Sequence, residues 1–198
     1  MYLIKRRLEK EFGFRTLLFS YPSVTGALDE NASALSQFIH EQDVDGIHIV
    51  GHSLGGVLAL RMLANDRHAL PGRVVCLGSP LTGSRAAKIL NAKEWAEEII
   101  GRSLPPGVIH QAANEWARHV CDGRDIGVIA GNVPLGFGRL VANFDEDNDG
   151  TVAVSETRID GARDHLIMPV SHKGMLVSSD VADQAGSFLK RGEFLRES

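Results

Sequence analysis

Residues Ile47-His-Ile-Val-Gly-His-Ser-Leu-Gly-Gly56 decide how this sequence is interpreted. The mostly apolar run from Ile47 to Val50 has β-branched side chains that favour a buried strand. The run from Val57 to Ala64 is rich in residues that favour a helix. Between the two lies a Gly-x-Ser-x-Gly pattern, residues 51–55, in the strand-to-helix context in which that pattern is meaningful. We therefore predict that Ser53 lies at the tip of a sharp turn.

The predicted turn explains why the pattern needs glycine and what it could do for a serine. Side chains at Gly51 and Gly55 are expected to collide with neighbouring backbone, and glycine also tolerates unusual dihedral angles. Ser53 would precede a helix, whose first N–H groups lack intrahelical acceptors and favour negative charge. Ser53 is thus a candidate nucleophile, and the backbone N–H of Leu54 is a candidate donor to an oxyanion.

The rest of the chain alternates between helical and strand patterns. Apolar periodicity predicts helices over 2–12, 28–41, 54–64 and 181–190, and strands over 16–21, 47–50, 73–78, 126–131 and 164–168. Such alternation predicts an α/β fold, a doubly wound and mostly parallel sheet with helices on both faces. We expect one domain over residues 1–198. Residues 85–120, which carry Trp95 and Trp116, would form either a helical cap over a site or crossover helices.

Composition narrows the class of protein. The chain has 198 residues, of which 43% are hydrophobic and 23% charged, enough apolar content for a single core. A net charge of −4 without a basic stripe gives no reason to expect nucleic acid. No apolar run is long enough to span a membrane, and no signal peptide is visible at Met1. We therefore expect a cytoplasmic protein. Cys76 and Cys121 lack disulfide or metal spacing.

A serine hydroxyl becomes a good nucleophile when a base takes its proton and a third group orients that base. In α/β folds with this turn, an acid and then a histidine follow the serine, each on a loop after a strand. Asp149 follows the predicted strand over 126–131, and His172 follows the one over 164–168. Ser53, Asp149 and His172 are therefore the candidate catalytic residues.

Other residues could also serve as the base or the acid. Most other histidines precede the acid or lie within the serine turn. His165 falls inside a predicted strand rather than after it, and it is the second candidate for the base. Asp149 is favoured as the acid because Gly150 allows a tight turn directly after it, and Asp147 is the second candidate.

The same segment matches a different motif. Asp145, Asp147 and Asp149, followed by Gly150 and by Glu156, fit the calcium-loop pattern D-x-[DN]-x-[DN]-G-x5-E. A calcium loop of that kind needs a helix on each side. Glycine and proline before and after the segment disfavour long helices there. The two interpretations compete for Asp149, because a carboxylate bound to calcium cannot also serve a histidine.

The motifs together resemble those of the α/β-hydrolase superfamily. The matching segments are Gly51–Gly56, Asp149–Val152 and Ser171–His172, with further likeness at 21–23, 77–84, 129–131, 164–165 and 172–175. The chain looks most like bacterial lipases and esterases related to the glycosylphosphatidylinositol-deacylase group. This resemblance covers nearly the whole chain, and it implies a Ser-His-Asp triad at Ser53, His172 and Asp149.

The sequence departs from that family at its amino end. The family begins with a strand ending in a His-Gly motif, whose loop donates the second oxyanion hydrogen bond. Here no strand and no His-Gly precede Tyr2, so the second donor is unassigned. The family's strand would lie between the predicted strands over 16–21 and 47–50. Its absence would leave unpaired backbone groups inside a sheet. We therefore expect a fragment, a misassigned start, or a variant in which another chain fills the gap, as in an oligomer.

Three functions remain open on the sequence. A serine hydrolase that cleaves lipid or short-chain carboxylic esters needs no cofactor and no metal. A catalytically weak or inactive truncated hydrolase could act as a binding module, with calcium at Asp145, Asp147, Asp149 and Glu156. An acyltransferase or thioesterase would use the same three residues.

Overall fold

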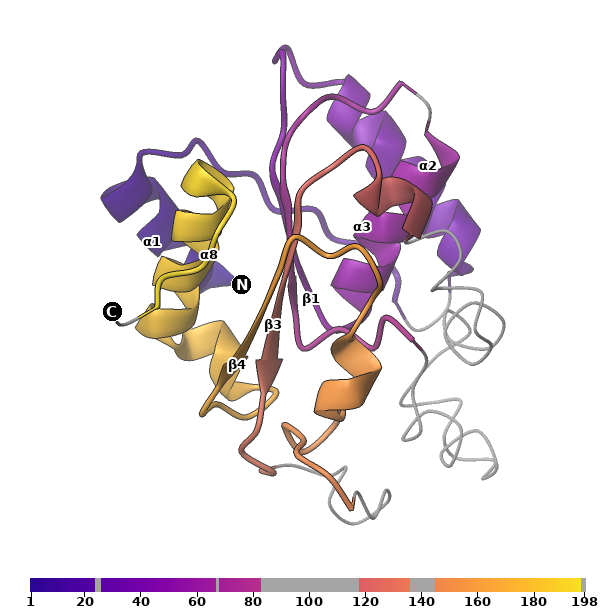
Figure 1. Ribbon diagram of the computed structural model, residues 1–198. Helices are drawn as coiled ribbons and strands as arrows, with labels where there is room; N and C mark the ends of the chain where they lie inside the picture. Colours follow the sequence, from indigo (N-terminus) through magenta and orange to yellow (C-terminus); the bar gives the residue numbers. More distant parts are fainter. Residues whose placement is uncertain (24–25, 67, 83–117, 136–144, 197–198) are drawn as a thin grey trace.

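The computed structural model describes residues 1–23, 26–66, 68–82, 118–135 and 145–196. Within them, a parallel sheet has the strand order β1-β2-β3-β4. The elements are β1 (Ile49–His52), β2 (Val74–Leu77), β3 (Ile126–Gly131) and β4 (Asp164–Met168), with helices α1 (Tyr2–Phe12), α2 (Leu28–His40), α3 (Leu54–Asn65) and α8 (Ser179–Arg191) and the short 3₁₀ helices η1 (Val154–Thr157) and η2 (Gly174–Val177). Figure 1 shows α1 and α8 on one face of the sheet and α2 and α3 on the other. The predicted α/β architecture is confirmed.

The two central strands are buried along their whole length. Every residue of β2 and of β3 is buried, as expected for parallel strands covered by helices on both faces. Helix α8 packs closely on this sheet. A Cβ atom added at Gly127 in β3 would lie 2.7 Å from the ring of Phe188, so glycine at this position lets the helix approach.

The first and the last of these helices lie side by side (Figure 1). Ile4 and Leu8 of α1 are 1% and 4% exposed, and they share one apolar cluster with Phe188. The Arg7 guanidinium donates to both carboxylate oxygens of Asp183, at 2.5 and 2.7 Å. Such a bidentate pair fixes orientation as well as proximity. One face of the sheet is therefore covered by helices that are far apart in the sequence.

One predicted strand is wrong. Residues Thr16–Tyr21 form no strand, and Leu17 and Leu18 are 48% and 51% exposed rather than buried. Strand propensity reflects a fit to a paired, half-buried surface. Here the neighbour is missing, because β1 is the edge strand of the sheet within the described residues. Residues 16–21 therefore pair with no strand of the described sheet.

Several other predictions differ from the structure only in their boundaries. The strand predicted to begin at Ile47 begins at Ile49 and continues to His52. The helices predicted over 28–41 and 181–190 are found as Leu28–His40 and Ser179–Arg191. The proposed cap over 85–120, with Trp95 and Trp116, lies outside the described residues except for 118–120, which belong to a helical segment over 118–121. The predictions over 2–12, 126–131 and 164–168 are confirmed to the residue.

Candidate active site

Ser53 lies where the sequence predicts, between the end of β1 and the start of α3. Its φ and ψ angles are 54° and −125°, and among the described residues it is the only non-glycine residue with positive φ. Gly51 makes this turn possible, since a Cβ atom there would lie 2.5 Å from the backbone of Gly55 and Gly56. A strained serine at a strand-to-helix turn is a feature of catalytic nucleophiles.

The predicted role of Gly55 is wrong. A Cβ atom added there would find only the hydroxyl of Tyr21, at 4.0 Å, which is ordinary van der Waals contact. The crowded glycine is instead Gly56, where a Cβ atom would lie 2.2 Å from the Oγ atom of Ser79. Ser79 follows β2 and is fully buried. The close approach of α3 to the end of β2 therefore depends on the third glycine of the motif.

Asp149 is held rigidly beyond the end of β3. Its side chain is 1% exposed, and Oδ1 accepts hydrogen bonds from the backbone N–H groups of Thr151 and Val152, at 2.9 and 2.7 Å. Oδ2 is left for His172, whose Nδ1 atom lies 2.7 Å away. Gly150 follows with a φ of 92°, which provides the predicted tight turn. Each carboxylate oxygen thus has a separate set of donors.

His172 lies after β4 with its ring directed at this carboxylate. The residue is 8% exposed, and its backbone N–H donates to the carbonyl oxygen of Asp149 at 2.9 Å. Because Oδ2 of an ionised Asp149 only accepts, Nδ1 carries the proton and Nε2 is left as a basic nitrogen. Within the described residues, neither Nε2 nor the Ser53 hydroxyl has a hydrogen-bond partner. Catalytic bonds of this kind often tighten only when substrate binds.

His52 contacts both the ring and the backbone carbonyl of His172. The two imidazole rings have centroids 4.6 Å apart, and Nε2 of His52 lies 2.9 Å from the carbonyl oxygen of His172. A carbonyl oxygen only accepts, so His52 donates. Burial, with the nearby His172 as a second cause, lowers the pKa of His52 to about 4. His52 is therefore neutral near pH 7, and it holds a contact to His172 that sequence reasoning overlooked because His52 lies within the turn.

The low pKa of His52 predicts a pH-dependent stability. Between its folded pKa of about 4 and its unfolded pKa of 6.5, the unfolded state binds more protons, so the free energy of unfolding falls as pH drops from 6.5 to 4. The loss attributable to His52 is about 3 kcal/mol. Urea unfolding of wild type and His52→Gln at several pH values checks this.

Two other histidines also make the free energy of unfolding depend on pH. Burial lowers the pKa values of His48 and His165 as well, so part of the pH dependence of stability will persist in His52→Gln. We expect the variant to have a clearly shallower dependence than wild type over this range. An identical slope in the two proteins would show that His52 is not held neutral by the fold.

Two strand-terminal glycines make room for the acid, and sequence reasoning missed both. A Cβ atom at Gly78, just after β2, would lie 2.9 Å from Oδ2 of Asp149. A Cβ atom at Gly131, the last residue of β3, would lie 2.9 Å from Cβ of Asp149 and 2.3 Å from the carbonyl oxygen of Val170. The fully buried Met175 completes this wall. The only signal in the sequence was a glycine at the end of each predicted strand.

The second candidates for the base and the acid lie elsewhere. Nε2 of His165 is 2.9 Å from the hydroxyl of Thr157. Within the described residues, no hydrogen bond joins this nitrogen to a carboxylate. Asp147 is exposed, and its carbonyl oxygen accepts from the N–H of Val154. The structure thus brings His172 together with Asp149, and it does not bring His165 or Asp147 to the pair.

The calcium-loop residues are separated in the same way. Asp145 and Asp147 are exposed, whereas Asp149 is occupied by His172 and two amides. The buried Glu156 accepts from the N–H of Ala153 at 3.0 Å at the start of η1, which has only four residues. Within the described residues, no group of three or more histidine, cysteine or acidic side chains could hold a metal ion. The helix that would enter the loop falls outside those residues.

The fold and the site define one class. A parallel sheet with helices on both faces, a strained serine in a Gly-x-Ser-x-Gly turn, and a later Asp–His pair at the carboxyl ends of its strands are typical of α/β hydrolases. A model of the Alpha/beta hydrolase family matches residues 2–184, and the chain belongs to that family.

Solved structures share the fold at low sequence identity. The mature lipase BlEst2 of Bacillus licheniformis superposes with a TM-score of 0.67 at 18% identity, over 86% of this chain and 76% of that one. The metagenomic carboxyl esterase MGS0156 gives 0.68 at 19% identity, over 85% of this chain and 57% of that one. A lipase-esterase related protein from Clostridium acetobutylicum gives 0.53 at 13% identity, over 97% and 88%. No protein of curated function matches the sequence.

Among the residues that the structure describes, no helix is both long and apolar enough to cross a bilayer.

Proposed function

We propose that this protein is a serine hydrolase that cleaves carboxylic esters through an acyl-enzyme. The observation that carries the proposal is the buried Asp149–His172 pair, joined at 2.7 Å beyond the strand ends, together with the strained Ser53. Family membership supports a hydrolase, and two of the structural neighbours, a lipase and a carboxyl esterase, favour an ester as substrate.

In the proposed reaction, Nε2 of His172 takes the proton from the Ser53 hydroxyl as Oγ attacks the ester carbonyl. The resulting imidazolium is stabilised by Asp149 at Nδ1, and it then protonates the departing alcohol. The acyl group remains on Ser53 until water, activated by the same histidine, releases the acid. The oxyanion forms at the start of α3, where the Leu54 N–H has no intrahelical acceptor.

The finer substrate class is also part of the proposal. The resemblance to the glycosylphosphatidylinositol-deacylase group favours an ester of a lipid over a short-chain ester. A thioesterase or acyltransferase would use the same three residues, and no contact within the described part of the chain favours either. Comparison of p-nitrophenyl butyrate with a long-chain ester and with an acyl thioester, each with and without added alcohol, separates these cases.

The decisive experiment uses a fluorophosphonate probe and intact-mass measurement. An activated serine displaces fluoride and forms a phosphonate ester, so we expect one adduct on the wild-type protein. The adduct should be absent from Ser53→Ala and present on Ser33→Ala, which removes an exposed hydroxyl in α2. No adduct on folded wild-type protein, or an adduct that persists in Ser53→Ala, would contradict the proposal.

A further inference from the structure

Ser53 and His172 follow strands that are not neighbours in the sheet. Ser53 comes directly after β1 and His172 comes after β4, and β2 and β3 lie between them. Hydrogen-bonded strands are spaced by about 4.8 Å, so β1 and β4 are roughly 14 Å apart. Residues 169–173, the base loop, must therefore extend back across the ends of β3 and β2 before His172 can serve the serine. The bonds that hold this loop decide where its imidazole lies.

On one side, the base loop is bound to the segment beyond β3. The N–H of Val133 donates to the carbonyl oxygen of Val170 at 3.3 Å, and the N–H of His172 donates to that of Asp149 at 2.9 Å. The ring of His172 adds its own bond to the Asp149 carboxylate at 2.7 Å. These three bonds fix His172 relative to its acid. None of them reaches the serine.

On the other side, a single hydrogen bond joins the base loop to the serine turn, residues 51–56. Nε2 of His52 donates to the carbonyl oxygen of His172 at 2.9 Å. In the part of the chain that the structure describes, no second hydrogen bond connects residues 169–173 with residues 51–56. Because His52 directly precedes Ser53, this bond ties the backbone of the base to the neighbour of the nucleophile.

His52 makes this bond without bringing a charge to the site. Burial lowers its pKa to about 4, so the ring is neutral near pH 7. Its centroid lies 4.6 Å from that of His172, which becomes a cation when it takes the serine proton. A lysine or an arginine could donate to the same carbonyl, but its charge would oppose the imidazolium at this distance. A neutral donor avoids that repulsion.

We propose that His52 is a positioning residue for the base: its N–H holds the carbonyl oxygen of His172 so that the imidazole stays within reach of Ser53. The effect on rate rests on the proposed hydrolase function, whereas the effect on the base loop does not. A catalytic group displaced by about 1 Å can cost about a hundredfold in rate. We therefore expect loss of the donor to lower kcat by about 10- to 100-fold, with KM nearly unchanged.

Two substitutions separate the donor from the bulk of the ring. His52→Phe keeps an aromatic ring of similar size but has no N–H group in it. His52→Gln loses the ring, and its side-chain amide nitrogen is the same number of bonds from the backbone as Nε2 of histidine. Positioning by the donor predicts a slow His52→Phe and a His52→Gln within about fivefold of wild type. Packing by the ring predicts the opposite order.

Steady-state kinetics with p-nitrophenyl butyrate measure the effect on rate. His52→Phe should lose about 10- to 100-fold in kcat and keep KM within about twofold. The pH at which kcat/KM is half-maximal should stay that of wild type, because His52 takes no part in the proton transfer. Wild-type kcat in His52→Phe, or an equal loss in His52→Gln, would overturn the proposal. A shifted pH midpoint would also overturn it, since it would assign His52 a role in acid-base chemistry.

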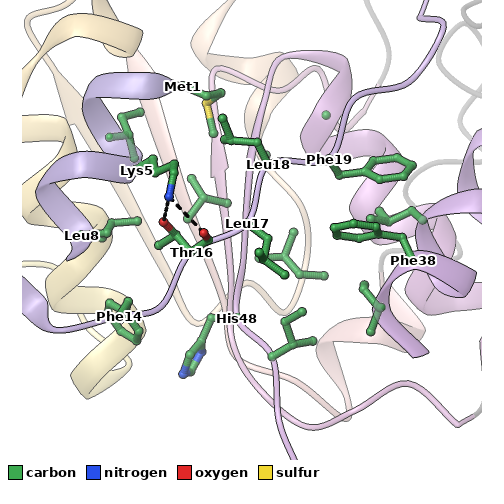
Figure 2. Close-up of a pocket in the computed structure, with 18 of the residues that line it drawn as sticks. Met1, Lys5, Leu8, Phe14, Thr16, Leu17, Leu18, Phe19, Phe38 and His48 are labelled. Atoms are coloured by element: carbon green, nitrogen blue, oxygen red, sulfur yellow. Dashed lines mark hydrogen bonds between the residues drawn. The ribbon is translucent and has the colours of Figure 1, made fainter. Parts of the chain in front are cut away.

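His48, directly before β1, provides the matched control. Its ring also bonds to backbone, with Nδ1 accepting from the N–H of Arg73 at 2.9 Å, and it lies 5.5 Å from the ring of Phe14 (Figure 2). His48→Phe therefore makes the same change at the other end of the strand, away from the base loop. We expect its kcat to stay within about twofold of wild type. A loss as large as that of His52→Phe would indicate a general loosening of β1 and would overturn the proposal.

Amide hydrogen exchange measured by NMR tests the base loop without any substrate. The His172 amide, bonded to Asp149, should exchange at least about tenfold faster in His52→Phe than in wild type, relative to the amide of the buried Val128 in β3. An unchanged ratio of the two exchange rates would overturn the proposal. If the wild type formed no fluorophosphonate adduct, the hydrolase proposal would fail and this ratio would still decide the role of His52. If the adduct formed while His52→Phe kept the wild-type ratio and kcat, the positioning role alone would fail.

Discussion

Ser53→Ala is expected to lower the turnover of p-nitrophenyl butyrate by on the order of a millionfold, because the nucleophile and its base act as one unit. Ser53→Gly should be equally inactive but more stable. A φ of 54° costs a residue with a side chain about 1–3 kcal/mol, and glycine removes that strain. The greater backbone entropy of unfolded glycine offsets roughly 0.5–1 kcal/mol. We expect a net gain of about 1 kcal/mol for Ser53→Gly.

Thermal and urea unfolding of the three proteins provide the measurement. A gain of this size raises Tm by about 2–4 °C in a chain of this length. Ser53→Ala retains a Cβ atom and therefore the strain, so its stability should stay close to that of wild type. If Ser53→Ala were as stable as Ser53→Gly, the turn would not be storing backbone strain at the serine. If either variant kept wild-type turnover, Ser53 would not be the nucleophile.

Asp149→Asn is expected to lower kcat about ten-thousandfold while the protein stays folded. The reason lies in how the two carboxylate oxygens are used. Oδ1 accepts from the N–H groups of Thr151 and Val152, so the amide oxygen of asparagine will take that position. Its NH₂ group then faces Nδ1 of His172 and forces the proton onto Nε2. A histidine protonated at Nε2 cannot accept the proton of the serine.

Asp147→Asn is the matched control for this change. Asp147 lies in the same segment and was the second candidate for the acid, but its side chain is exposed. We expect its kcat to stay within about twofold of wild type, as for surface substitutions in general. Steady-state kinetics on both variants, with urea unfolding to confirm the fold, distinguishes the two acids. A large loss in Asp147→Asn with a small one in Asp149→Asn would reverse the assignment.

Much of the fold could be predicted because local patterns and tertiary structure agree. The helix over 2–12 and the strands over 126–131 and 164–168 were predicted from their local patterns, and the structure has all three with the predicted bounds. Chain order placed Asp149 and His172 after their strands. The carboxyl ends of parallel strands meet at one edge of a sheet, so this order alone brought the pair together.

The predictions that failed concern contacts between segments distant in sequence. Residues 16–21 have strand propensity, but a strand also needs a paired neighbour, which no local pattern reports. The crowding at Gly56 comes from Ser79, and the support of His172 comes from His52. Each depends on how two elements approach, at the scale of an ångström. A single sequence names the residues but does not give those separations.

The packing of α1 on α8 has a consequence for how the protein is made. Ile4, Leu8 and Arg7 find their partners near Phe188 and Asp183, which are translated last among the described elements. Until α8 has been synthesised, α1 has no helix to pack against. Its apolar side chains are then exposed to chaperones or to other nascent chains. Closure of that face must therefore wait until α8 has been synthesised, and contacts of such long range form slowly. Release of α8 from the ribosome, rather than formation of the serine turn, would then set the moment at which the molecule becomes resistant to proteases.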